Sequence, residues 1–333
     1  MPALSPRFRS DLLLLLAAVI WGFAFVAQRT GMEHLGPFAF NGVRFAIGAA
    51  VLVPVILLPD RRPPAVAPPR SPAAVRRSPS VILSGLAAGS VLFAAAALQQ
   101  AGIAYTTAGK AGFITSLYVV LVPLLGLLLG HRVGPATWVG ALLAAAGLYF
   151  LTMQGSFRMA PGDMLVLLGA VLWAVHFLLL GRLSPGRDPL RLAFGQFVTC
   201  AALSAGVALF FETTTAANLR AALGALLFTG IFSVGVGYTL QVVGQRHAPP
   251  ADAAIILSLE AVFAVVGGWL LLGEQLTQRA LFGCGLMLAG ILVSQLWPQR
   301  EDSRPTMDDG PTTAAGKVPG TRDQVPGVAT SDE

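Results

Sequence analysis

Four ionisable residues stand inside long runs of apolar residues, where a charged group is costly to place. They are Arg44, Lys110, His176 and Glu260. A charged side chain at the centre of a membrane helix costs about 2.5–3.5 kcal/mol on insertion scales, so it usually has a partner or a task. If these runs span a membrane, the four residues are the first candidates for binding a solute or moving a proton.

Lys110 stands at the head of an apolar run that ends at Gly130, and it allows three interpretations. Near the membrane surface, its ammonium can reach the interface while its stem lies along the helix. Facing a central cavity, it can bind a carboxylate or phosphate of a solute. Paired with a neighbouring span, it is structural, and the flanking Gly109 and Gly112 allow that close helix packing.

Glu260 and His176 lie further from the ends of their runs, and Arg44 stands seven residues into its own. A carboxyl at Glu260 that gains and loses a proton can couple solute movement to protons; a fixed structural hydrogen bond is the alternative. His176 can shuttle that proton, because its ordinary pKa is about 6.5, or it is a neutral, hydrogen-bonded core residue. Arg44 is either a structural partner of a carbonyl or acid, or a clamp for the solute.

Polar and aromatic residues at related depths extend this set. Gln99 lies toward the same membrane face as Arg44 and Lys110, whereas Gln196 and Gln241 lie toward the other face with Glu260 and His176. Aromatic residues in between can form a cavity wall with an apolar face and a polar donor. The predicted cavity residues are Lys110, Glu260, Tyr118, Trp21, Trp173, His176, Arg44, Gln99, Gln196 and Gln241.

Motifs of other functional classes are absent from the sequence. It contains no GxxxxGK[ST] for ATP and no GxSxG or HExxH for hydrolysis. Cys200 and Cys284 lie far apart in apolar runs, and no Cys/His spacing indicates a metal. We therefore expect neither an enzyme nor a bound metal or cofactor.

The composition indicates the environment of these residues. Hydrophobic residues make up 55% of the 333 residues and charged residues only 11%, with a mean hydropathy of +0.72. Soluble domains carry roughly 25% charged residues. The chain is therefore predicted to be an all-α polytopic membrane protein, and its net charge of +6 is interpreted as membrane topology rather than nucleic-acid binding.

Ten apolar runs are long enough to cross a bilayer, which takes about 20 residues of helix. They are 11–29, 37–58, 81–100, 106–129, 136–153, 163–181, 190–211, 221–243, 252–272 and 280–297. With a cytoplasmic N-terminus, sixteen Lys and Arg fall on the cytoplasmic side and four on the other. Because positive residues are enriched inside, we expect both termini in the cytoplasm.

Three segments are too polar to span a membrane. Residues 1–10 form a cytoplasmic N-terminus, and the Arg- and Pro-rich loop 59–80 is expected to be extended or disordered beside anionic headgroups. Residues 299–333 are polar and low in large apolar groups, so we expect a disordered cytoplasmic tail. The remaining boundaries are 11–153 for a first repeat and 163–297 for a second.

These two repeats are visible in the sequence itself. The segment "DLLLLLAAVIWGFAF" (11–25) aligns with "DMLVLLGAVLWAVHF" (163–177), and residues 110–130 align with 253–273. Trp21 thereby matches Trp173, and Phe25 matches Phe177. Each half has five spans, an odd number, so the second enters the membrane from the opposite side. Inverted repeats of this kind form a solute site near the midplane, exposed alternately to each face.

The segments "AAVIWGFAFVAQRTGMEHLGPFAFNGVRFAIGA", "TTAGKAGFITSLYVVLVPLLGLLLG" and "LSLEAVFAVVGGWLLLGEQLT" resemble the EamA family of the drug/metabolite transporter superfamily. The resemblance covers residues 11 to about 297. It implies ten helices around a central cavity, with both termini inside. The family usually has Leu-Glu-Pro where this chain has Leu259-Glu260-Ala261, so we expect a straighter helix near Glu260.

The resemblance implies a secondary transporter of a bacterial inner membrane, an exporter of small metabolites such as amino acids or amphipathic drugs. Its expected partners are a small-molecule substrate, the lipid bilayer and, as coupling ion, protons. One alternative is a transporter of phosphorylated or nucleotide-linked sugars, for which Lys110 and Arg44 would supply cationic groups. A membrane-embedded sensor or enzyme is the alternative of another class. The sequence does not indicate the oligomeric state.

Overall fold

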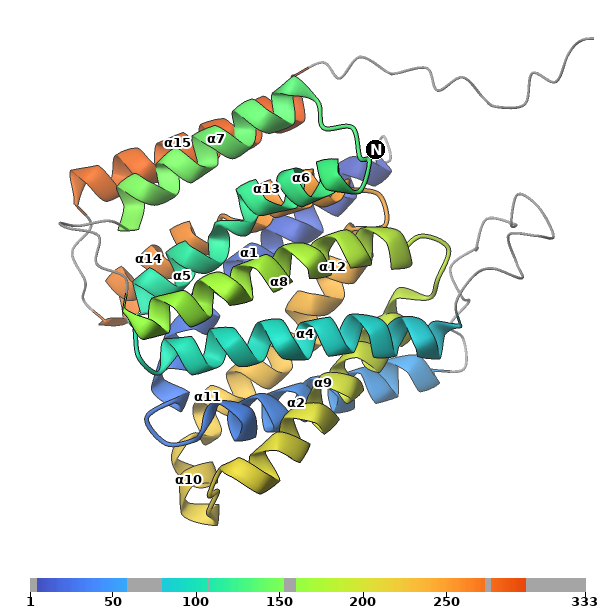
Figure 1. Cartoon of the computed structure of the whole chain (residues 1–333), viewed down its shortest axis with the longest axis vertical. Coiled ribbons are helices and arrows are strands. Elements are labelled where there is room, and N and C mark those ends of the chain that lie inside the picture. Colours follow the sequence, from blue (N-terminus) through green and yellow to red (C-terminus); the bar gives the residue numbers. More distant parts are fainter. Residues whose placement is uncertain (1–4, 59–79, 107, 153–159, 273–276, 298–333) are drawn as a thin grey trace, which may run out of the picture. The chain divides into compact units, whose positions relative to one another are not determined.

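The structure is a computed structural model that describes residues 5–58, 80–106, 108–152, 160–272 and 277–297 (Figure 1). The predicted Arg/Pro loop and C-terminal tail lie outside the described residues. Within the described ranges the chain is helical and contains no strand. The helices are α1 (Pro6–Gly31), α2 (Pro37–Leu57), α4 (Val81–Ile103), α5 (Ala108–Ser116), α6 (Tyr118–Leu128), α7 (Pro135–Thr152), α8 (Pro161–Leu183), α9 (Pro189–Phe211), α10 (Ala216–Ala221), α11 (Leu223–Leu227), η1 (Phe228–Tyr238), α12 (Thr239–Gly244), α13 (Pro250–Leu257), α14 (Glu260–Leu272) and α15 (Gln278–Leu296).

All ten predicted spans are helical. In the described residues, eight helical segments are long and apolar enough to cross a membrane, and α7 and α15 are shorter apolar helices. Large apolar side chains such as Leu128, Leu209 and Phe210 remain more than 80% exposed. Such exposure suits lipid and not water. The chain is therefore an all-α multi-pass membrane protein.

Proline and short polar residues determine where many helices begin. Proline is the first residue of α1, α2, α7, α8, α9 and α13, a position where its missing N–H is not needed. Ser5, Ser80 and Asp188 accept hydrogen bonds from backbone N–H groups in the first turns of α1, α4 and α9. These caps satisfy donors that no preceding turn can bond.

Helix contacts follow the same pattern in both halves. Helix α8 packs along α4, and its counterpart α1 packs along α11, η1 and α12, which correspond to α4 (Figure 1). Two helices of the first half pack against the corresponding helices of the second half: α2 against α9, and α7 against α15. The list of neighbours is therefore the same when the helices of one half are exchanged for the corresponding helices of the other.

Two corresponding spans are interrupted near their middle. The fourth span breaks at Leu117, between α5 and α6, and the ninth breaks at Ser258 and Leu259, between α13 and α14. Leu117 (φ −60°, ψ −12°) and Ser258 (φ −60°, ψ −16°) have nearly the same backbone geometry. The N–H groups of Leu117 and Leu259 each donate to a carbonyl three residues back, as in a 3₁₀ turn.

The break in the ninth span corrects one expectation. Without the family's proline at Ala261, the helix was expected to be straighter near Glu260, but α14 begins anew at Glu260 after the turn. The hydroxyl of Ser258 donates to the carbonyl of Ile255 at 2.7 Å. A serine that bonds the preceding turn bends a helix, and this bond accompanies the break in the absence of proline.

The eighth span contains a wide turn instead of a break. Residues Phe228–Tyr238 form the π-helical segment η1, which includes Gly230, Gly235 and Gly237. A π-helix bonds each N–H five residues back, so it widens the helix and usually occurs at a functional site. A Cβ at Gly237 would lie 2.5 Å from Nε1 of Trp21, so this glycine lets α1 approach.

A buried acid joins four helices at the start of the ninth span. Asp252 is 2% exposed. Its carboxylate accepts hydrogen bonds from Arg7 at 2.9 Å, Thr137 at 3.2 Å and Ser294 at 3.3 Å. These residues belong to α1, α7 and α15, so one carboxylate connects α13 to all three.

A second buried acid has the equivalent task at the start of the sixth span. Asp163 is fully buried in the first turn of α8. It accepts a hydrogen bond from the backbone N–H of Ala160 at 2.8 Å, which closes the helix start. It also accepts from the hydroxyl of Thr106, which follows α4. This acid therefore ties α8 to the segment that leads into the fourth span.

Candidate functional site

A narrow cavity lies where the two halves meet. Both halves contribute, through α1, α4, α5 and α6 from the first and α8, η1, α12 and α14 from the second. The lining residues are Trp21, Phe25, Gln28, Gln99, Thr115, Tyr118, Trp173, Phe177, Ser233, Tyr238, Gln241 and Glu260. The space among them is about 30 Å³, room for about two water molecules. In this conformation the cavity is closed to a metabolite.

Glu260 is the acid of the cavity and is only 4% exposed. Its Oε1 accepts hydrogen bonds from the Tyr118 hydroxyl at 2.9 Å and from the Ser116 hydroxyl at 3.4 Å. Within the described residues its Oε2 forms no hydrogen bond. Glu260 is the first residue of α14 and Tyr118 the first of α6, so the two broken spans present their bonded polar groups to the same cavity.

The two matching tryptophans have equivalent partners. Trp21 Nε1 donates to the backbone carbonyl of Ser233 at 3.1 Å, and Trp173 Nε1 donates to Oε1 of Gln99 at 2.7 Å. Trp21 thus bonds the eighth span and Trp173 the third, which is the corresponding span of the other half. Both indole N–H groups are satisfied, and their rings remain available as cavity walls.

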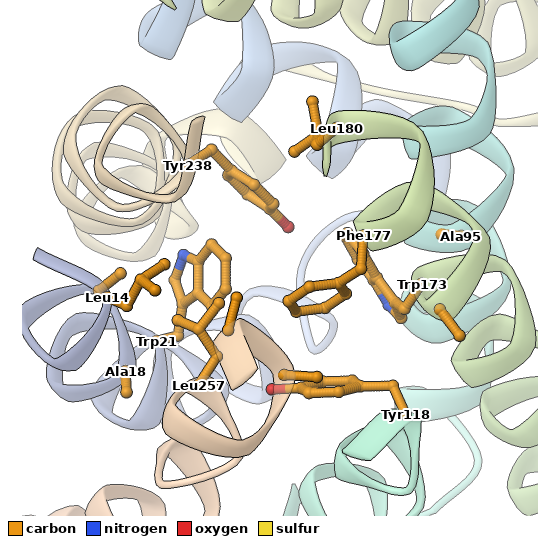
Figure 2. Packing of buried hydrophobic residues seen from close by; sticks show 14 of the residues in the cluster. Leu14, Ala18, Trp21, Ala95, Tyr118, Trp173, Phe177, Leu180, Tyr238 and Leu257 are labelled. Carbon is orange, nitrogen blue, oxygen red and sulfur yellow. The ribbon is translucent and has the colours of Figure 1, made fainter. Parts of the chain in front are cut away.

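Six of the twelve lining residues are aromatic, and Figure 2 shows five of their rings. Tyr238 lies with its ring centroid 4.7 Å from that of Trp21 and 5.9 Å from that of Trp173, and it is nearly parallel to the latter. Across the cavity, the rings of Tyr118 and Phe177 are 4.8 Å apart. The Tyr238 hydroxyl points into the space between these rings in Figure 2.

Some lining polar groups have no partner in the part of the chain that the structure describes. Gln241 is fully buried, and neither its Oε1 nor its Nε2 forms a hydrogen bond there. The hydroxyl of Thr115, 3% exposed, is also unpaired. A buried polar group without a partner costs about 1–3 kcal/mol, so these groups are suited to bonding water or a solute.

Six of the predicted residues line this cavity: Trp21, Gln99, Tyr118, Trp173, Gln241 and Glu260. Gln99 was placed in one predicted layer and Glu260 and Gln241 in another, yet all three face one cavity. For Lys110, the structure describes the helix but not the side chain, so its role stays a prediction. Tyr238, which was not among the predicted residues, also lines the cavity.

The other predicted residues are buried outside the lining. His176 Nε2 and Gln196 Oε1 are 2.9 Å apart and bonded to each other, and His176 also packs edge-on against Trp173. Arg44 donates from Nε to Oδ1 of Asn41 at 2.8 Å. Its guanidinium lies over the rings of Phe40 and Phe45, at 5.7 and 5.0 Å from their centroids.

Several lining residues were not predicted, although one signal could have found some of them. Phe25 and Gln28 follow Trp21 at four and seven residues, and Phe177 follows Trp173 at four, so each set shares a helix face. Thr115 and Ser233 carry no such signal in the sequence. Among the described residues, no group of three His, Cys, Asp or Glu could hold a metal ion.

Fold and site together define a class: a multi-pass membrane protein of the transporter type, with two matching halves around a central cavity. The model of the EamA-like transporter family matches residues 8–153 and 160–296. The chain belongs to this family, and the two matches correspond to its two halves.

Similar proteins agree with this assignment. A transporter of Archaeoglobus fulgidus is 34% identical over 291 residues, which are 87% of each chain. The threonine/homoserine exporter RhtA of Escherichia coli is 28% identical over 183 residues, covering 52% of this chain and 59% of its own. A crystal structure that is 24% identical superposes with a TM-score of 0.68 over 89% of this chain; at that identity the likeness concerns the fold alone.

Proposed function

We propose that this protein is a secondary transporter that exports a small metabolite across the bacterial inner membrane by alternating access. The observation that carries the proposal is the cavity, because it takes lining residues from both repeats and from both interrupted spans. Spans interrupted at the membrane midplane supply solute and ion sites in many transporters. The similarity to the threonine/homoserine exporter RhtA favours export of a small polar metabolite.

Opening of the cavity requires movement of one half against the other, because the closed space holds only about two water molecules. The turns at Leu117 and at Ser258–Leu259 are suitable hinges, since a short 3₁₀ turn inside a helix often marks one. The inverted arrangement of the halves, with both termini in the cytoplasm, belongs to this proposal. It rests on five spans per half and on the distribution of Lys and Arg.

Proton coupling is proposed to act through Glu260. Its carboxyl faces the cavity, and the hydroxyl of Tyr118 can follow either protonation state as donor or acceptor. Among the described lining residues, the remaining titratable group is the phenol of Tyr238. His176 stays less suited to shuttling that proton, because its Nε2 is engaged by Gln196.

Transport of sugar phosphates receives less support. That function needs cationic groups around the solute, and the described lining contains no Lys, Arg or His. Arg44 is turned toward Asn41, Phe40 and Phe45. A membrane-embedded enzyme or sensor receives no support from the family or from the motifs.

The test is solute-driven charge movement in proteoliposomes on a solid-supported membrane. Wild-type protein is challenged with amines, amino acids and sugar phosphates, with and without a pH gradient, beside Glu260→Gln. The matched control is Glu33→Gln, the same change at an exposed residue outside the cavity. We expect a current for at least one solute that depends on Glu260. Folded protein that gives no solute-dependent signal would contradict the proposal.

A further inference from the structure

We propose that the cavity recognises a protonated amine carried on an aromatic or other flat apolar body. Glu260 is the counter-ion, the aromatic walls hold the body, and Gln241 and Thr115 bond a polar substituent. The inference rests on the proposed transport function and specifies the class of solute for the same site.

The charge of the lining is the first argument. Glu260 is an acid, the described lining has no cationic residue, and Tyr118 and Tyr238 are neutral phenols. An ionised carboxylate in a low-dielectric surrounding needs an opposite charge close by. Because one oxygen of Glu260 is held by Tyr118 and the other has no partner among the described residues, one ammonium can complete the pair.

The aromatic walls are the second argument. Ring faces attract cations within about 6 Å, and tryptophan does so most strongly. The ring centroid of Tyr238 lies 4.7 Å from that of Trp21 and 5.9 Å from that of Trp173. The ring of Phe177 lies beside that of Tyr118. Walls of this kind suit an ammonium near Glu260 and a flat apolar body between the rings (Figure 2).

The unpaired side-chain groups of Gln241 and Thr115 are the third argument, which is independent of the other two. Gln241 offers a donor and an acceptor, and Thr115 offers a hydroxyl; all three atoms are buried and unpaired in the described chain. The free-energy cost of leaving these atoms without hydrogen bonds is removed when a solute brings a hydroxyl, amide or carbonyl group to them. A site built to bond such groups discriminates strongly against solutes that lack them.

Anionic solutes are disfavoured by the position of Arg44, a buried cation. The Arg44 guanidinium lies over Phe45, whose ring centroid is 5.8 Å from that of Tyr238, a lining residue. Arg44 itself does not line the cavity. A phosphate or isolated carboxylate would therefore meet Glu260 and neutral amides, without a positive partner among the described lining residues.

The experiment is a fluorescence titration of the full chain in detergent, excited at a wavelength that selects tryptophan. Trp21 and Trp173 in the cavity wall serve as reporters. Four probes share one ring and differ in charge: 2-phenylethylamine, phenylalanine, 2-phenylethanol and 3-phenylpropionate. Glucose 6-phosphate is the fifth. We expect 2-phenylethylamine to bind at least tenfold more tightly than 3-phenylpropionate and glucose 6-phosphate.

Two variants connect this preference to the site. Glu260→Gln is expected to reduce amine affinity at least tenfold and to remove the preference for the cation over 2-phenylethanol. Glu33→Gln makes the same change at an exposed residue outside the cavity and is expected to bind like wild type. Thermal unfolding identifies any variant that fails to fold. In that case the probe series on the wild-type protein still tests the inference.

Each contrary outcome has a separate meaning. Equal or tighter binding of 3-phenylpropionate or glucose 6-phosphate would overturn the amine inference and leave a solute cavity, and with it the transport proposal, in place. An unchanged preference in folded Glu260→Gln would also overturn the inference. No response to any probe, together with no solute-driven current in proteoliposomes, would overturn both proposals.

Discussion

Tyr118 and Glu260 are joined by a hydrogen bond of 2.9 Å, and each is the first residue after the interruption of its span. The two spans correspond to each other in the repeats. The bond therefore connects the two broken helices across the boundary between the halves. Any movement that separates the halves at this point must break it or carry both residues together.

Replacement of Tyr118 by phenylalanine tests this connection. We expect Tyr118→Phe to lower the free energy of unfolding by about 1 kcal/mol, the usual net value of one hydrogen bond. We also expect faster exchange of backbone amides around Ser258 and Leu259. Thermal unfolding and hydrogen exchange measure the two effects. Unchanged exchange at the break would show that Tyr118 does not hold the ninth span.

Glu260→Gln is expected to make solute transport independent of the proton gradient. Glutamine keeps the size and an acceptor for Tyr118 but cannot bind and release a proton. The measurement is the rate of solute-driven charge movement at several imposed pH gradients, with Glu33→Gln as control. If transport by Glu260→Gln follows the pH gradient as steeply as wild type, another group carries the proton.

The bond from Trp173 to Gln99 predicts a non-additive pair of substitutions. Gln99→Leu leaves the buried indole N–H of Trp173 without its acceptor, at a cost of about 1–3 kcal/mol. Trp173→Phe in the same chain removes that donor. We therefore expect the double variant to be less destabilised than the sum of the single ones, as measured by denaturant unfolding. Strict additivity would mean that the bond contributes nothing to stability.

The contact between α7 and α15 depends on glycines. A Cβ at Gly147 would lie 2.6 Å from the backbone oxygen of Gly283 and 2.6 Å from Met287, whereas a Cβ at Gly285 would meet nothing within 4 Å. We expect Gly147→Ala to destabilise the protein by about 1–3 kcal/mol, as overpacking does. Gly285→Ala on the same helix pair is the control and should be neutral or stabilising. Equal melting temperatures for both variants would contradict this reading of the contact.

The two buried acids at the ends of the spans predict local effects at separate places. Asp252→Asn weakens the pair with Arg7 and should speed amide exchange at the starts of α1 and α13. Asp163→Asn should speed amide exchange at the start of α8, because the Asp163 carboxylate accepts hydrogen bonds there from Thr106 and Ala160. Hydrogen exchange followed by mass spectrometry resolves these segments. Exchange that rises uniformly in both variants would indicate global destabilisation instead.

The hydropathy of the sequence was sufficient to predict the membrane spans, but it did not predict where two of them are interrupted. Apolar runs of sufficient length can satisfy their backbone only as helices in lipid, so every predicted span is helical. The break at Leu117 has no glycine or proline at that position, and the break at Ser258 occurs without the family's proline. Neither break has the residue type that usually interrupts a helix, so hydropathy and periodicity do not indicate it.

Residue types that are uncommon inside membrane spans predicted only some of the residues that line the cavity. Glu260 and the paired tryptophans face it, whereas Arg44, His176 and Gln196 are buried against other helices with partners of their own. Rarity indicates that a polar group is buried, not which way it points. Gln28 and Thr115 were missed because a common polar residue becomes recognisable only once helix faces are assigned.

The pairing of α2 with α9 and of α7 with α15 has a consequence for how the chain can be assembled. In each of these pairs, a helix of one half packs against the corresponding helix of the other half. These helix contacts can therefore align the two halves. Two separately translated fragments, ending at 153 and beginning at 160, should find each other in a membrane and copurify through a tag on one of them.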